Sequence, residues 1–565
     1  MRFKRFVALV LICCLSAVLL PGASSAGASD FMLWVSPTGE KTIDAICLLE
    51  VSKQNYYLFL PGNISLEEWK IGCNTASAII NGTVIASGVS PASILKTDEA
   101  NSVNVLKGSK VIKKLNFTVM QGSDLPTMYI TTESGSMRKI HKNKSNKEPG
   151  SMVLYDTDGS TVYNGGLKHI KMRGNASTRY RKHNYAIKLE SGANLLGMGK
   201  AKKWILLGNH LDKSLIRNQM NFAMARYAGI PYTPDCQQVS VYVNNEYYGI
   251  FLLTEKIEVD DDRVDVRDLE KETEEMNDKD LSEYPLYGWD YARRGGYKAK
   301  KIPNEPEDVT GGYILEFEYD PHNYATVESA YVTKRNMFLI IHSPEYCSER
   351  QIKYISEFMQ GYENAIFAKD GIDPDSGKHY SEFVDFDSLV NKYLINEVSK
   401  NYDSNMSSEY FFKPDDSAST KAYAGPVWDL DNTYGDYTLP GNKKMLTPRL
   451  MFVNHRGSLS YWWPALSRQE DFHAAVIQRY HDTFVPALEI LLGRREETDV
   501  LKSIDTYAQA IEKSVDMEYV RYPGLKLPQG NAEVQTGRNL EENIAYLKDY
   551  ITQRMEFLSE EWKQE

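Results

Sequence analysis

Residues 168–189 read Lys168-His-Ile-Lys-Met-Arg-Gly-Asn-Ala-Ser-Thr-Arg-Tyr-Arg-Lys-His-Asn-Tyr-Ala-Ile-Lys-Leu189. The runs 168–173 and 184–189 both alternate apolar and polar residues, and a polar turn, 174–177, separates them. Alternation with a period of two predicts strands, because successive side chains of a strand point to opposite faces. Lys188 falls on the face opposite the apolar residues of the second run. The stretch therefore predicts two strands joined by a polar, basic turn.

Helices and strands alternate after this stretch. A helix with one apolar face is expected to follow, capped by Asp212 or Ser214. The runs 239–243 and 247–253 then predict a hairpin closed by Asn244-Asn245, since asparagine tolerates positive φ. This order of elements favours an α+β fold.

Two polar segments are expected to lie outside the regular framework. Residues 138–150 predict an exposed hairpin or loop, and the long, acidic segment 259–309 predicts an insertion or a mobile lid. A second amphipathic helix is expected at 387–400, and a strand is expected to run into 427–431. The chain beyond residue 466 is expected to be mostly helical.

The N-terminal part has a different pattern. Short apolar or alternating runs broken by turn residues predict a small, all-β, Ig-like sandwich at 29–122. A second domain is expected over 125–565, with 450–565 as its helical C-terminal part.

The first residues predict export. A basic start, an apolar run at 6–20 and small residues after it are typical of a secretory signal peptide, assigned here to 1–26. An uncleaved membrane anchor is the alternative. The formal net charge of −11 becomes −14 when the three basic leader residues are removed, which argues against bulk nucleic-acid binding. We therefore expect a secreted or cell-surface protein that meets a membrane only through its leader.

Four cysteines remain after the leader. In an oxidising space the economical pairing is Cys47 with Cys73 and Cys236 with Cys347. Four buried, unpaired thiols are the alternative.

Carboxylates in the second half of the chain suggest a metal site. Asp429 and Asp431 are two positions apart on the expected strand, so both would face one side and could hold a hard cation such as Mg²⁺. Asp403 follows the second helix and could orient or deprotonate a hydroxyl nucleophile. Ser408 could complete the coordination. The alternatives are a pair of solvated strand-end aspartates for Asp429 and Asp431, a helix-ending turn for Asp403 and an ordinary polar loop residue for Ser408.

Basic residues around the opening stretch suggest a phosphate site. Arg173, Asn175 and Lys188 lie in or beside the turn, and guanidinium and ammonium groups complement phosphate oxygens. Arg217, on the first helix, is a further candidate. Glu255 ends the second strand of the hairpin. A solvated basic face is the alternative.

Taken together, the chain from about residue 125 to 450 resembles the CotH kinase family, an atypical protein-kinase-like, bilobal fold. The matching text is Met172-Arg-Gly-Asn-Ala-Ser177, Asn184-Tyr-Ala-Ile-Lys-Leu189, Trp204-Ile-Leu-Leu-Gly-Asn209, Asp212-Lys-Ser-Leu-Ile-Arg-Asn218, Val243-Asn-Asn-Glu-Tyr-Tyr-Gly249, Leu252-Leu-Thr-Glu-Lys-Ile257, Gly311-Gly-Tyr-Ile-Leu-Glu316 and Trp428-Asp-Leu-Asp431.

The resemblance implies an ATP-dependent kinase that requires Mg²⁺ or Mn²⁺ and phosphorylates Ser or Thr of secreted, spore-coat or cell-envelope proteins. It implies that Lys188 contacts nucleotide phosphates and that the hinge between the two lobes lies near Glu255. It also implies that Asp403 positions the acceptor hydroxyl and that Asp429 and Asp431 hold the metal. Two departures stand out: no Gly-x-Gly-x-x-Gly loop is present, and Ser408 stands where some relatives carry a metal-binding Asn.

Two other functions stay open. The kinase-like scaffold could be inactive and serve as a surface or binding protein. Less directly, the 37 Tyr and 8 Trp residues permit a carbohydrate-active enzyme.

Overall fold

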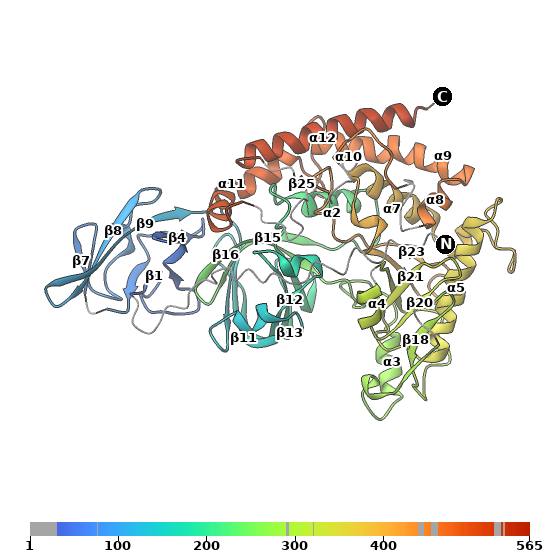
Figure 1. The fold of residues 1–565 in the computed structure, drawn as a ribbon, viewed down its shortest axis with the longest axis horizontal. Coiled ribbons are helices and arrows are strands. Elements are labelled where there is room, and N and C mark those ends of the chain that lie inside the picture. Colours follow the sequence, from blue (N-terminus) through green and yellow to red (C-terminus); the bar gives the residue numbers. More distant parts are fainter. Residues whose placement is uncertain are drawn as a thin grey trace, which may run out of the picture.

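The computed structural model describes residues 31–75, 77–289, 293–319, 321–438, 446–453, 461–524, 533–534 and 537–564. These residues form a mixed α+β protein with several sheets, which confirms the expected class. Figure 1 shows the N-terminal sheets at one end, a barrel in the middle, and a second large sheet with helices at the other end. The predicted leader, 1–26, lies outside the described residues.

The N-terminal part consists of two sheets around one core. The smaller sheet has the order β2-β1-β5 and the larger one β3-β4-β9-β8-β6-β7. Apolar residues of both sheets fill the space between them, as the alternating sequence pattern requires. The strands are β1 (Leu33–Ser36), β2 (Ile46–Cys47), β3 (Leu49–Ser52), β4 (Asn55–Leu60), β5 (Lys70–Cys73), β6 (Ala78–Ile80), β7 (Thr83–Ile85), β8 (Ala100–Lys107) and β9 (Lys110–Gln121).

Seven strands then close into a barrel with the order β10-β11-β12-β13-β14-β16-β15. Its interior is a separate apolar core, which includes Tyr185, Ile187 and Leu189, so Lys188 points outward as the sequence pattern predicts. The strands are β10 (Thr127–Thr132), β11 (Lys147–Tyr155), β12 (Thr161–Arg173), β13 (Asn184–Asn194), β14 (Lys200–Leu207), β15 (Cys236–Val243) and β16 (Glu246–Glu255).

Local predictions in the barrel have mixed outcomes. The hairpin of β15 and β16 is confirmed, and Asn244 and Asn245 have φ values of 52° and 68°. The segment 138–150 is not simply a loop, because it contains helix α1 (Arg138–Lys142) and the first part of β11. The many polar residues of this segment are compatible with a solvent-exposed helix, which an apolar pattern does not reveal.

An antiparallel seven-stranded sheet follows, with the order β17-β18-β20-β21-β19-β22-β23. The acidic segment 259–309 is therefore not a detached lid, because it supplies a helix and the first two strands of this sheet. Its short strands are interrupted by charged turns, which hides their periodicity in the sequence. The elements are α3 (Leu269–Glu275), β17 (Leu286–Trp289), β18 (Tyr297–Lys300), β19 (Tyr313–Phe317), β20 (Ala330–Val332), β21 (Phe338–Ser343), β22 (Glu409–Lys413) and β23 (Tyr423–Ala424).

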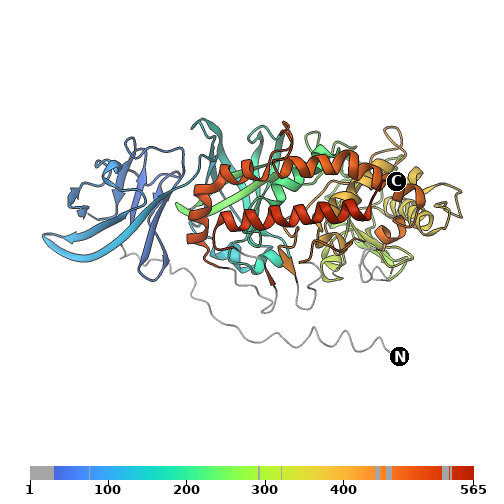
Figure 2. The same cartoon turned by 90° about the horizontal axis from the view of Figure 1, so that it is seen from above.

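Helices cover this sheet and reach back to the barrel. Figure 2 shows long C-terminal helices lying along this part of the molecule, and α11 packs against α12. The apolar residues of α11 and α12 join one large core with α2, α7 and the antiparallel sheet. The elements are α2 (Arg217–Tyr227), α4 (Pro321–Thr326), α5 (Glu349–Phe367), α6 (Tyr380–Phe383), α7 (Phe386–Ser399), α8 (Trp462–Leu466), α9 (Glu470–Arg479), α10 (Val485–Leu491), α11 (Ile504–Arg521), α12 (Leu540–Glu561), and the paired strands β24 (Tyr437–Thr438) and β25 (Glu533–Val534).

None of the helices in the described part of the chain combines the length and the apolar character that a membrane crossing requires.

The expected disulfides do not form. Cys47 and Cys73 flank β1 on opposite sides, paired in register with Trp34 and Leu33. Two strand spacings separate them by roughly 9–10 Å, whereas a disulfide needs Cα atoms within about 7 Å. Cys236 lies in β15 of the barrel, and Cys347 lies after β21 of the antiparallel sheet. All four thiols are free.

Candidate functional site

Three aspartates lie on two irregular segments next to the antiparallel seven-stranded sheet. Asp403 begins a short 3-10 helix (Asp403–Asn405) directly after α7. Asp429 and Asp431 follow β23 on a segment that is not a strand, because Asp429 has a left-handed φ of 57°. The predicted strand at 427–431 is therefore wrong. The two carboxyl groups nevertheless meet, because the turn brings them within hydrogen-bond contact.

These carboxyl groups share one electrostatic environment. Burial raises the pKa of Asp403 well above its usual value, and the charges of Asp429, Glu318 and Glu409 add to this effect. The pKa of Asp431 is also well above its usual value, through burial first and then the charges of Asp429 and Asp403. A half-buried group of like charges favours a proton or a cation. The cluster is therefore suited to binding positive charge.

The fit to a divalent cation is partial. Among the described residues, no group of three or more His, Cys, Asp or Glu side chains is arranged to hold a metal ion by itself. Magnesium, however, commonly binds proteins through one or two carboxylates and takes its other ligands from phosphates and water. The touching pair Asp429 and Asp431 satisfies that smaller requirement.

Arg173 brings the barrel to this cluster. It ends β12, and its guanidinium group lies over the ring of Trp428, 5.1 Å from the ring centre. Burial lowers the pKa of Arg173, while the charges of Tyr410, Asp429 and Glu316 raise it. The same guanidinium opposes the rise in the pKa of Asp429. A cation from the barrel thus stands beside the acidic cluster.

Glu316 organises the space between them, and the sequence analysis gave it no role. It lies in β19 and accepts hydrogen bonds from the Ser408 amide and the Tyr410 hydroxyl, both at 3.0 Å, and it contacts His342 Nε2 at 2.5 Å. Ser408 therefore meets this site through its backbone, with a left-handed φ of 63°. A lone carboxylate in the apolar run Tyr313–Phe317 is the signal that could have found Glu316.

A second buried carboxylate supports the same strands. Glu409 is paired with Lys392 at 3.8 Å and accepts a hydrogen bond from Asn396 at 3.0 Å. Its pKa is raised to about 7, chiefly by burial, which outweighs the attraction of Lys392.

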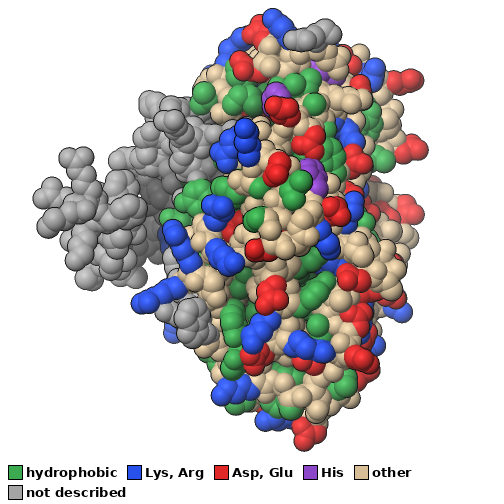
Figure 3. Space-filling view, turned by 90° about the vertical axis from the view of Figure 1, so that its right-hand side faces the viewer, with side chains coloured by type: hydrophobic (Ala, Val, Ile, Leu, Met, Phe, Trp, Pro, Cys, Tyr) green, Lys and Arg blue, Asp and Glu red, His purple; other side chains and the backbone are tan. Residues whose placement is uncertain are grey.

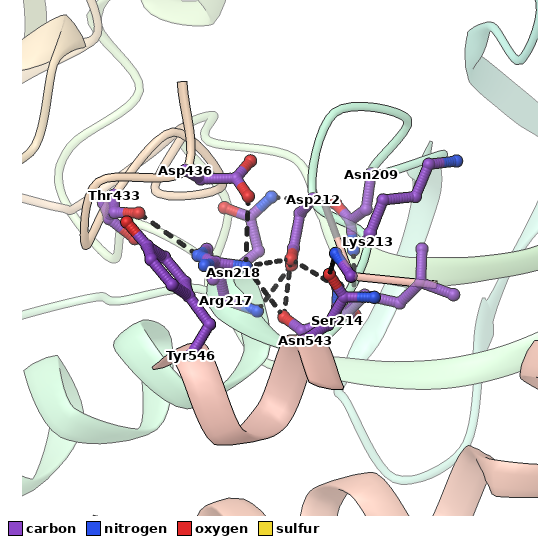
Figure 4. A network of polar contacts seen from close by, with 12 residues as sticks. Asn209, Asp212, Lys213, Ser214, Arg217, Asn218, Thr433, Asp436, Asn543 and Tyr546 are labelled. Carbon is purple, nitrogen blue, oxygen red and sulfur yellow. Dashed lines mark hydrogen bonds and ion pairs between the residues drawn. The ribbon is translucent and has the colours of Figure 1, made fainter. Parts of the chain in front are cut away.

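Arg217 belongs to a buried network on the other side of Asp431, shown in Figure 4. Its guanidinium contacts Asp212 at 2.5 Å and Asp436 at 3.4 Å, and it donates to the Thr433 carbonyl at 3.1 Å. Asp436 accepts no hydrogen bond within the described structure, and burial raises its pKa to about 8. Arg217 is only 2% exposed, so it acts as a buried clamp: its contacts hold in place the segment that carries Asp431, rather than a ligand in solution.

Asn218 completes this clamp. Its side-chain oxygen accepts a hydrogen bond from the Leu430 amide at 2.7 Å, between the two aspartates of the cluster. Helix α2 therefore fixes the backbone on both sides of Asp431.

Lys188 lies elsewhere on the outer barrel wall. It lines a pocket of about 590 Å³ together with Lys203 and Glu258, which are ion-paired at 2.6 Å. Burial and the charge of Lys203 lower the pKa of Lys188. The remaining lysines of this pocket are Lys200 and Lys202.

The last two predicted residues have local partners. Asn175 is exposed and accepts a hydrogen bond from Lys144 at 3.1 Å. Glu255 pairs with Arg263 at 2.5 Å and accepts a hydrogen bond from the Asp235 amide. Burial raises the pKa of Glu255 to about 7.

The structure thus brings together one part of the predicted set. Asp403, Asp429, Asp431 and Arg173 share one location, and Arg217 supports it from behind. Lys188 lines a pocket with other lysines and Glu258.

Comparison with known proteins identifies the family of the chain. A search of curated proteins finds none that matches this chain. A family model described as CotH kinase protein matches residues 170–558, which is more than half of the chain and includes the barrel hairpin, the acidic cluster and the C-terminal helices. The chain therefore belongs to the CotH kinase protein family.

Proposed function

We propose that this protein is a kinase that transfers the terminal phosphate of ATP to a Ser or Thr hydroxyl of an exported protein. Family membership supports kinase-like chemistry. The observation that carries the proposal is the meeting of Arg173, from the barrel, with Asp429, beside Asp403 and Asp431. A site for phosphate transfer combines basic side chains that contact the phosphate oxygens with carboxylates that hold the metal ion.

Each residue has a role in this scheme. The hydroxyl oxygen of the acceptor bonds to the γ-phosphorus, the bond between that phosphorus and the bridging oxygen breaks, and ADP leaves. Asp403 orients the hydroxyl and takes its proton. Arg173 holds phosphate oxygens. Asp429 and Asp431 would hold Mg²⁺ or Mn²⁺, which supplies charge neutralisation for the phosphates.

The wider architecture fits the same proposal. The barrel would act as one lobe, and the antiparallel seven-stranded sheet with its helices would act as the other. Lys188, Lys203 and Glu258 would extend the basic wall along which the nucleotide lies. The acceptor would be a protein of the cell surface, a spore coat or another extracellular assembly, which the predicted leader would place within reach.

A nucleotide-binding experiment tests the proposal. MgATP is expected to raise the melting temperature of the wild-type protein, because a ligand that binds only the folded state stabilises it. Asp429→Ala should abolish this rise, whereas Asp499→Ala, at an exposed acidic position outside both the cluster and the Lys188 pocket, should keep it. Transfer of ³²P from γ-labelled ATP to casein should be lost in Asp403→Asn. A wild-type protein that neither responds to MgATP nor labels any protein would leave an inactive scaffold instead.

A further inference from the structure

The tip of the β8–β9 hairpin carries a basic and apolar surface that no part of the proposed reaction uses. All eight residues from Lys107 to Lys114 are exposed. Figures 1 and 2 place this hairpin at the end of the molecule farthest from α5 and the antiparallel seven-stranded sheet. The hairpin tip is therefore remote from Asp403 and takes no part in the proposed phosphate transfer.

All the charged side chains of the hairpin are basic. It carries Lys107, Lys110, Lys113 and Lys114, and the sequence from 100 to 121 contains no acidic residue. None of the four lysines has an ion pair within the described structure. Figure 3 shows the opposite end of the molecule, where basic and acidic side chains are interspersed. In a chain with a net charge of −11, this local excess is a specific feature.

Apolar side chains lie among these lysines. Ile112 is 58% exposed and Val111 is 38% exposed. The strand register slips here, so that Leu106 pairs with Val111 but Val105 pairs with Lys113, which makes Ile112 the extra residue of a bulge. Bulges re-aim a side chain away from the regular pleat. Two aliphatic side chains are thus exposed to solvent among the four lysines of the hairpin tip.

The edge strand of the sheet, two positions beyond β8, adds an apolar side chain to one face. Val84, on the edge strand β7, is 67% exposed. Its row across the sheet runs through Ile79 and Asn104 to Lys114, so Val84 and Lys114 lie on the same face. Lys113 pairs with the buried Val105 and so lies on the opposite face, which means that the basic and apolar side chains flank the hairpin tip on both of its faces.

We propose that this hairpin tip docks on an anionic lipid bilayer. Lysines on a surface attract anionic headgroups, and aliphatic side chains among them gain from entering the interface. A soluble polyanion would use the lysines but would gain nothing from Ile112. The docked protein would point its other end, with the acidic cluster, away from the bilayer. This goes beyond the expectation that the chain meets a membrane only through its leader, and it does not depend on phosphate transfer.

Vesicle sedimentation with the full chain tests this proposal. Binding is expected to phosphatidylcholine vesicles containing phosphatidylglycerol, and it should weaken with salt and disappear without the anionic lipid. Replacing Lys110, Lys113 and Lys114 by Gln should weaken binding about 100-fold, at about fivefold per lysine. The matched control replaces three exposed lysines elsewhere, Lys53, Lys301 and Lys369, and should bind as the wild type does.

Ile112→Ser separates a bilayer from other anionic partners. We expect several-fold weaker vesicle binding with unchanged binding to immobilised heparin, because only the bilayer interacts with the apolar side chain. All variants keep the same N-terminal residues, so any binding by the leader is common to them. The proposal is overturned if the lysine variant binds vesicles as tightly as its control, or if Ile112→Ser leaves vesicle binding unchanged. Heparin binding without vesicle binding would overturn it too.

Discussion

At the scale of single residues, the acidic cluster is held by side chains whose charge is costly. Glu409 is 3% exposed, and one of its carboxylate oxygens accepts no hydrogen bond in the described structure. Burial raises its pKa from 4.5 to about 7, so the folded protein holds a proton here over a range in which the unfolded chain has lost it. This residue thus contributes most to stability at low pH, and the contribution is lost as the pH rises toward 7.

Glu409→Gln should therefore change how stability depends on pH. The rise in pKa corresponds to about 3 kcal/mol, so the variant should gain about that much relative to the wild type between pH 4.5 and pH 8. Urea unfolding of both proteins across this range measures the difference. Glu496→Gln, at an exposed position, serves as the control and should run parallel to the wild type. A constant difference between Glu409→Gln and the wild type would show that Glu409 binds the same number of protons in the folded and unfolded states, so that its pKa is not raised.

At the scale of elements, helix α11 ties three parts of the molecule together. Glu518 pairs with Lys182 at 2.7 Å and accepts the Ile250 amide at 3.0 Å, which joins α11 to the barrel. The Tyr519 hydroxyl donates to the Lys213 carbonyl at 2.6 Å, on the loop that leads into α2. The turn between β12 and β13 is therefore anchored by a helix more than 300 residues later. Lys182 lies in the basic stretch 168–189, and both ends of its ion pair are buried.

Breaking the ion pair of Glu518 and Lys182 should strongly lower the free energy of unfolding. Glu518→Ala leaves a buried lysine without its partner, which is expected to cost about 3–5 kcal/mol of unfolding free energy. The double variant with Lys182→Met should lose less than the sum of the two single variants, because neither buried charge remains. Guanidinium unfolding gives these values. Asp505→Ala removes the exposed pair of Asp505 and Lys548 on the same helix, and it should cost below about 1 kcal/mol. Equal losses at the two sites would contradict the anchoring role of Glu518.

At the scale of the whole molecule, periodic patterns predicted the elements, whereas long-range contacts set the site. The alternation around Lys188 predicted its outward direction because a strand has only two faces. The same logic failed at Asp429, where a left-handed residue ends the alternation. Spacing could not show that Arg173 would meet Asp429 or that Lys182 would be buried by Glu518, because these contacts join residues hundreds of positions apart. The economical disulfides failed for the same reason, since sequence distance says nothing about which strand lies between two cysteines.

The N-terminal module should unfold together with the rest of the protein. Met517 of α11 and Tyr242 of the barrel belong to the core of this module, and Ser514 accepts a hydrogen bond from the Ser123 amide at 2.8 Å. Such shared burial couples domains, whereas a bare linker leaves them independent. Calorimetry of the full chain should therefore show one transition. Met517→Asp places a charge in the shared core and should split this transition or lower the part that belongs to residues 31–121, while Met276→Asp, at a position 49% exposed, should leave the profile unchanged. Two separate transitions in the wild type would mean that the shared core contributes too little to join the module to the barrel.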